Sequence, residues 1–202
     1  MDEPSQLRVL PGGESRSLSA LDDDELALLS GAGQKTAFSI LASRYLARLT
    51  NFCGKFAGNR RIGEELAQET LLQVWRSCRS YKANGRFVAY LFTIARNRCR
   101  NHLRDSGRRQ RFELGLSREA VHGPTDASHL GTLVEEERCR RVHEALASLP
   151  LKLREAMLLR FDQELSYADI ARIIRRPEAT ARTRVLRAVR KLRADMAQEE
   201  QS

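Results

Sequence analysis

The chain has 202 residues, which is enough for one domain or two small ones and too few for a large multi-lobed enzyme. Its 35 Lys and Arg residues outnumber 26 Asp and Glu residues, and the formal net charge of +9 predicts an anionic partner. Nucleic acid is the leading candidate for that partner, and an anionic membrane surface is the second. Hydrophobic residues make up 42% of the chain, which allows a buried core and excludes a wholly disordered protein.

No apolar run approaches the ~18 residues that a membrane span needs, and no secretory signal is visible. We therefore expect a cytoplasmic protein without membrane insertion. The four cysteines lack C-x-x-C spacing, so we expect reduced and mostly buried thiols. A zinc site of Cys99 with His102, His122 or His129 is the alternative, but it lacks a second paired half at zinc-like spacing. We predict no metal and no cofactor.

Helical periodicity begins after an irregular start. Residues 1–20 contain Pro, Gly and Ser with little periodicity, and we expect them to form a flexible tail. Apolar residues then recur at steps of three and four over 36–56, which predicts a helix. A second helix is predicted over about 62–78 and a third over about 86–104, with the turn signal Asn-Gly at 84–85 between them.

The pattern breaks after the third helix and then returns. Residues 105–132 hold glycines, a proline and scattered charge, and a stretch of that length is better interpreted as a linker than as an ordinary loop. The second half is helical again. Ser166 and Asp169 have capping-box spacing, so Ser166 is the expected N-cap of a further helix. Pro177 interrupts the pattern before a last, basic helix.

These elements predict an all-α fold of two small helical domains joined by a flexible linker. We find no convincing strand and no internal repeat. The expected boundaries follow the breaks in periodicity: a tail at 1–20, a first domain at 21–104, a linker at 105–136, a second domain at 137–196 and a tail at 197–202.

The charge is segregated along the chain. Eleven basic residues and one acid lie in 76–111, and nine basic residues and one acid lie in 172–193. Residues 62–75 instead hold three glutamates and no base. A single run of basic residues is as often a solvated helix face as a nucleic-acid-binding surface. Two basic runs, each at the end of a helical unit, favour nucleic-acid binding.

Residues 166–193 have the outline of a helix-turn-helix: a short helix, a three-residue break at 175–177 and a longer basic helix. The first residues of the second helix would touch base edges in the major groove. Arginines further along would hold phosphates, which set register but not sequence. The break lacks a glycine, so a left-handed residue there would cost about 1–2 kcal/mol. An ordinary helical hairpin with a basic surface is the alternative.

At this point two blocks of the chain resemble a known family. Residues 146–150, 154–161 and 165–171 resemble the C-terminal domain of bacterial sigma factors, which reads the minus-35 promoter element. Residues 64–75 resemble the family's core-polymerase-binding helix, and residues 87–97 resemble the segment that opens and reads the minus-ten element. The order and spacing are similar to those of the extracytoplasmic-function (ECF) group of the sigma-70 family, which has two sigma domains.

The resemblance implies a non-enzymatic subunit that binds core RNA polymerase, directs it to specific promoters and helps to melt DNA for transcription initiation. It implies sigma domain 2 at 21–104 and sigma domain 4, with the helix-turn-helix, at 137–196. The implied partners are the largest subunits of core polymerase, promoter DNA and, as in many relatives, an anti-sigma factor. The segment 80–86 would capture a base flipped out of the minus-ten element.

The implied site residues fall into three groups. The core polymerase-binding residues are Glu65, Leu66, Gln68, Glu69, Leu72 and Trp75. The minus-ten DNA-binding residues are Arg79, Lys82, Arg86, Tyr90, Arg96, Asn97 and Arg100. The minus-35 DNA-binding residues are Tyr167, Arg176, Glu178, Ala179, Thr180, Arg182, Thr183, Arg184 and Arg187.

Three positions depart from the family pattern. Ala179 replaces a glycine that is common in the recognition helix, the pair at 175–176 replaces a Gly-apolar pair, and Ile62 stands where many relatives carry an acid. One alternative function is a helix-turn-helix transcriptional regulator that acts without core polymerase, which leaves residues 64–75 unexplained. Another is a DNA recombinase, but its α/β catalytic domain has no counterpart among the expected elements.

Overall fold

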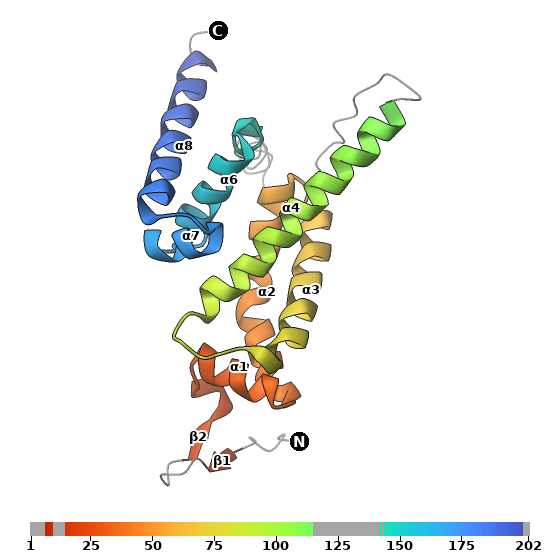
Figure 1. Cartoon of the computed structure of the whole chain (residues 1–202), viewed down its shortest axis with the longest axis vertical. Coiled ribbons are helices and arrows are strands. Elements are labelled where there is room, and N and C mark those ends of the chain that lie inside the picture. The colour runs from red at the N-terminus through yellow and green to blue at the C-terminus, as the bar shows by residue number, and fades with distance from the viewer. Residues whose placement is uncertain (1–6, 10–14, 115–141, 143, 200–202) are drawn as a thin grey trace, which may run out of the picture.

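The computed structural model describes residues 7–9, 15–114, 142 and 144–199. These residues are helical almost throughout and form two helical units (Figure 1), which confirms the all-α fold class. The first unit contains α1 (Asp23–Gly31), α2 (Lys35–Ala57), α3 (Arg60–Ser77), the 3-10 turn η2 (Cys78–Ser80) and α4 (Phe87–Leu114). Residues 144–148 are helical and precede α6 (Leu151–Met157), the π-helical turn η3 (Leu158–Asp162), α7 (Tyr167–Ile174) and α8 (Glu178–Glu199).

The described residues of the N-terminal segment, 7–9 and 15–20, contain regular structure that was not expected. Strands β1 (Leu7–Val9) and β2 (Ser15–Ser17) pair in antiparallel fashion, so the prediction that the chain contains no strand was wrong here. The 3-10 turn η1 (Leu18–Ala20) follows, and Leu18 is buried in the core. Residues 18–20 are therefore part of the packed structure and not of a flexible tail, because Leu18 packs into the hydrophobic core.

Capping residues fix the ends of the first helices. Asp22 accepts a hydrogen bond from the backbone N–H of Glu25, whose side chain accepts one from Asp22, and this capping box begins α1. Gly58 ends α2 in the left-handed conformation, and the Asn59 side chain caps α3 by accepting from the Ile62 N–H. Each of these helix ends is determined by residues next to it in the sequence.

Two helices are longer than the sequence indicated. The helix α4 continues to Leu114, past its expected end at about 104, so the first residues of the expected linker are helical. Residues 115–136 of that linker lie outside the described residues. The helix α8 continues to Glu199, past the expected boundary at 196. The extension of α8 consists of Ala, Gln and Glu, which have good helix propensity, and the end of the α4 extension contains Arg, Gln, Glu and Leu, which also favour a helix without an apolar stripe.

The helices α2 and α3 approach most closely where two glycines face each other. A Cβ atom on Gly63 of α3 would lie 2.5 Å from the Cα of Gly54 on α2 and 3.0 Å from the Thr50 carbonyl oxygen. Below this crossing, Phe52 of α2 packs edge-on against Phe92 of α4, with ring centroids 5.3 Å apart. The close approach at Gly63 thus sets the distance at which α3 lies on the rest of the first unit.

The helix-turn-helix begins and breaks where the sequence predicted. The Ser166 side chain accepts a hydrogen bond from the Asp169 N–H and caps α7, as its spacing predicted. Arg175 ends α7 at φ 52°, in the left-handed region where glycine is the usual residue. The buried side chains of Ile170, Ala181 and Val185 hold α7 and α8 together.

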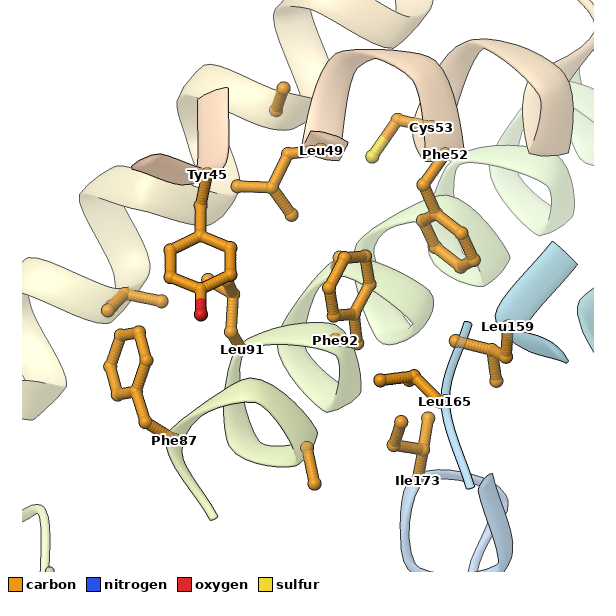
Figure 2. Packing of buried hydrophobic residues seen from close by; sticks show 14 of the residues in the cluster. Tyr45, Leu49, Phe52, Cys53, Phe87, Leu91, Phe92, Leu159, Leu165 and Ile173 are labelled. Carbon is orange, nitrogen blue, oxygen red and sulfur yellow. The ribbon is translucent and has the colours of Figure 1, made fainter. Parts of the chain in front are cut away.

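The two helical units pack against each other. The helix α7 lies on α4 (Figure 1). The turn η3 lies on α2. Figure 2 shows Leu159, Leu165 and Ile173 of the second unit gathered beside Phe92 of the first. These side chains are buried in one continuous hydrophobic cluster. The chain therefore has two units but a shared core between them.

The glycine crossing gives a stability prediction. Gly63→Ala places a methyl group against the α2 backbone, so we expect the free energy of unfolding to fall by about 1–3 kcal/mol in chemical denaturation. Gly107→Ala in α4 is the matched control, because a Cβ there meets nothing within 4 Å. Helix propensity predicts that this control gains about 0.5–1 kcal/mol. Equal effects of the two substitutions would contradict the close approach.

Candidate nucleic-acid interface

The N-terminal turn of α8 presents an exposed polar surface. Glu178, Ala179, Arg182 and Thr183 are exposed there, while Thr180 is half-buried. The Arg182 guanidinium lies 3.4 Å from the Glu178 carboxylate and 4.9 Å from the centre of the Tyr167 ring. Tyr167 thereby joins α7 to the first turn of α8. The structure brings these predicted residues together on one face, with Arg182 held over the ring by a cation–π contact.

Not every predicted arginine of the helix-turn-helix lies on that face. Arg176 and Arg187 are exposed. Arg184 is only 16% exposed and donates a hydrogen bond to the Glu155 carboxylate at 3.0 Å. In this conformation Arg184 thus stabilises the second unit from within and is not presented to solvent.

A hollow of about 400 Å³ lies where the loop between η2 and α4 meets the start of α4. Lys82, Arg86 and Tyr90 from the predicted set line it. The complete lining is Ser80, Tyr81, Lys82, Asn84, Arg86, Ala89, Tyr90, Thr93 and Arg172. Two aromatic rings and several cations around one hollow match what a single unstacked base requires.

The rings of this hollow are held by hydrogen bonds. Tyr90 donates to the Ser77 hydroxyl, and its ring centroid lies 4.9 Å from that of Tyr81. Tyr81 donates to the Asp24 carboxylate of α1. Burial first, and then the Asp24 carboxylate, raise the pKa of the Tyr81 hydroxyl well above its ordinary value. Sequence reasoning missed Tyr81, although it directly precedes Lys82 and lies within the segment expected to capture a base.

The arginines of α4 have different surroundings. Arg96 and Arg100 both donate to the buried Glu155 carboxylate, and Arg96 is only 12% exposed. Asn97 and Arg79 are exposed. Arg79 lies beside a second, smaller hollow together with Trp75 and not beside the first one. The seven predicted minus-ten residues are therefore divided between an open hollow, an interdomain contact and the neighbouring surface.

The predicted polymerase-binding residues lie along α3. Glu65, Gln68 and Glu69 are exposed. Leu72, on the same helix, is 55% exposed. Leu66 is buried, and Trp75 is half-buried, with its ring centroid 5.0 Å from that of Phe38. The surface of α3 is therefore an exposed leucine bordered by acids and an amide, while Leu66 belongs to the core.

Three of the four thiols lie in the described part of the chain. Cys53, Cys78 and Cys99 are free and buried, and the Cys53 and Cys99 thiols are hydrogen-bonded to each other. That hydrogen bond and burial raise the pKa of Cys99, and burial raises the pKa of Cys78 to about 11. Within the described ranges, no three His, Cys, Asp or Glu side chains could hold a metal ion together. His122, His129 and Cys139 lie outside those ranges.

Among the helices of the described residues, none is both long enough and apolar enough to cross a membrane.

Comparison with known proteins identifies both units. The model of Sigma-70 region 2 matches residues 41–109, and the model of Sigma-70, region 4 matches residues 139–192. The chain is 31% identical to the ECF RNA polymerase sigma-E factor of Haemophilus influenzae, over 83% of this chain and 92% of that one. It is 28% identical to the RNA polymerase sigma-H factor of Pseudomonas aeruginosa, over 85% of this chain and 92% of that one.

Solved structures agree with this assignment. The sigma factor RpoE of Bartonella quintana, in complex with the anti-sigma factor NepR, matches with a TM-score of 0.64 and 28% identity. That match covers 78% of this chain and 94% of that one. CnrH, in complex with the cytosolic domain of CnrY, shares the fold, with a TM-score of 0.67 at 21% identity over 87% of this chain and 97% of that one. The chain belongs to the sigma-70 family of RNA polymerase sigma factors, in its extracytoplasmic-function group.

Proposed function

We propose that this sigma factor binds core RNA polymerase through α3, directs it to promoters with minus-ten and minus-35 elements, and helps to melt the DNA. It acts as a non-catalytic subunit in the cytoplasm, with sigma domain 2 at about 21–104 and sigma domain 4 at about 137–196. The observation that carries this proposal is that an acidic-apolar face on α3 accompanies two separate basic surfaces. A regulator acting without polymerase would leave that α3 face without a role.

The minus-35 element would be read by the first turns of α8. Glu178 and Arg182 are exposed and adjacent, and a glutamate accepts from cytosine while an arginine donates to guanine. Thr183 lies on the same face. Arg176 and Arg187 would hold phosphates on either side, and such contacts fix the register of the helix in the groove.

The minus-ten element would be held at the hollow before α4. Tyr81 and Tyr90 offer aromatic surface to an unstacked base, while Lys82 and Arg86 offer charge to the adjacent phosphates. A base must leave the duplex to enter such a hollow, so capture stabilises the melted strand.

Core polymerase would bind the face of α3 around Leu72. An exposed leucine with a polar rim has the composition of an interface centre, and the glutamates beside it fit a basic helical surface of the largest subunits. Because the matched relatives from Bartonella and the CnrH structure are complexes with partner proteins, we also propose an anti-sigma factor as a partner.

The polymerase contact is tested by Leu72→Ala. Loss of about 1.4 kcal/mol of apolar burial predicts a dissociation constant for core polymerase about tenfold higher. The same variant should give correspondingly less run-off transcript at limiting sigma factor. Leu28→Ala on α1 is the matched control, because Leu28 is 47% exposed and lies on another helix. Unchanged polymerase binding by Leu72→Ala, or an equal loss with Leu28→Ala, would refute the assignment of this face.

The minus-35 contact is tested by comparing two arginines of α8. Arg182→Ala should reduce discrimination between correct and substituted minus-35 elements by about 1–3 kcal/mol in holoenzyme binding. Arg187→Ala should weaken binding to all sequences alike and lower the slope of binding against salt by about one. If Arg187→Ala alters sequence preference and Arg182→Ala does not, the two roles are assigned wrongly.

A further inference from the structure

We infer that Asp24 of α1 is a positioning residue for base capture, and that α1 supports the base-capture segment, residues 80–86. This inference rests on the proposed function and deepens it, because it concerns the hollow at which the minus-ten element would be held. Asp24 does not touch DNA in this proposal. It acts through the hydroxyl of Tyr81, which donates a hydrogen bond to its carboxylate.

The helix α1 approaches this part of the chain at two points. Near the C-terminal end of α1, a Cβ atom on Gly31 would lie 2.4 Å from the Cys78 carbonyl oxygen, so α1 packs directly on η2. Near its N-terminal end, one oxygen of Asp24 accepts from Tyr81. The other oxygen lies beside Gly85, where a Cβ atom would be 3.9 Å from it. The helix α1 therefore follows the chain from η2 to the turn at this glycine.

The first turn of α1 is itself held in place. The capping box of Asp22 and Glu25 encloses Asp24 in the sequence. Asp23 forms an ion pair with Arg44 of α2 at 2.8 Å. The Asp24 carboxylate thus comes from a fixed helical turn and not from a loop, which makes its position more exact.

Tyr81 depends on this carboxylate for the place of its hydroxyl. Its ring packs edge-on against Phe87, with centroids 5.8 Å apart, and the centroid of the Tyr90 ring lies 4.9 Å away. A half-buried hydroxyl also needs a hydrogen-bond partner, which Asp24 supplies. Without that acceptor the hydroxyl would turn toward water and move the ring with it. The ring would then no longer be set for a base that enters the hollow.

The charge of Asp24 is unfavourable beside a site for DNA. Lys82 and Arg86 line the hollow, and the phosphates that they would attract are repelled by a carboxylate. Asp24 is paired with no Lys or Arg of the described residues, unlike Asp23. Its hydrogen bond to Tyr81 gives this carboxylate a role that its charge does not.

Two substitutions of Asp24 separate the hydrogen bond from the charge. Asp24→Ala and Asp24→Asn both remove the negative charge, but only asparagine keeps an oxygen that can accept from Tyr81. The probe is the single-stranded non-template minus-ten region of a promoter that wild-type holoenzyme transcribes, and fluorescence anisotropy measures its affinity for holoenzyme. We expect Asp24→Ala to bind it about fivefold more weakly than wild type, and Asp24→Asn within about twofold of wild type. Electrostatics alone predicts tighter binding by both variants alike.

Asp23→Ala is the matched control on the same helical turn. It also removes a carboxylate and the hydrogen bond of a tyrosine, Tyr45, but that ring does not line the hollow. We expect this variant to bind the probe within about twofold of wild type. A loss equal to that of Asp24→Ala would mean that the first turn of α1 matters only for folding.

Tyr81→Phe removes the hydroxyl from the other side of the same bond. We expect it to weaken binding about as much as Asp24→Ala does, and the double variant to show no further loss, because both changes break one interaction. Circular dichroism shows whether each variant is folded. If Asp24→Ala is not, then Tyr81→Phe and Asp24→Asn still make the comparison, and wild-type affinity in Tyr81→Phe would overturn the inference.

Abasic probes show whether the effect belongs to base capture. Removing the captured base from the probe should weaken binding by wild-type holoenzyme about fivefold, and binding by Asp24→Ala less than about twofold. A general defect in the fold would instead leave the response to the missing base unchanged.

The outcomes separate the inference from the proposed function. If no abasic position weakens binding by wild type, base capture is rejected, and the role of Asp24 with it. If wild type responds to one position but Asp24→Ala keeps both its affinity and that response, positioning by Asp24 alone is overturned. An Asp24→Asn variant as weak as Asp24→Ala, or additive losses in the double variant, would overturn it as well.

Discussion

A single buried carboxylate determines how the two halves of this sigma factor meet. Glu155 has no contact with water, so it requires cationic partners, and α4, α6 and α8 must converge for Arg96, Arg100 and Arg184 to reach it. If one partner of such a pair is removed, the other charge stays buried without compensation. The free-energy penalty of that buried charge exceeds what the intact pair contributes to stability. The position of sigma domain 4 on sigma domain 2 is therefore specified by this residue together with the surrounding apolar contacts.

The same arrangement determines which of the predicted binding residues are accessible. An α3 face that stays exposed can meet polymerase, while the arginines of α4 are occupied by a carboxylate of the other domain. In this conformation the donors of Arg96 and Arg100 are therefore engaged with Glu155, while Lys82 and Arg86 lie at the hollow before α4.

The elements were predictable from the sequence where local signals existed. The periodicity over 36–56, the cap at Ser166 and the break at 175–177 each appear in the structure. The paired strands β1 and β2, which are only three residues each, and the extension of α4 to Leu114, which has no apolar stripe, were missed. Glu155 was missed for another reason: it lies in an apolar helical stripe, and its three partners are more than twenty residues away in sequence. Which arginines face DNA and which face Glu155 depends on tertiary contacts that no local pattern contains.

The distance between the two units tests this account most directly. Spin labels on the exposed residues Ser43 of α2 and Lys152 of α6 would report it in the free chain. The account predicts one narrow, short distance, because Glu155 binds Arg96 and Arg100 of the other unit. A broad or long distance in the free chain would contradict it.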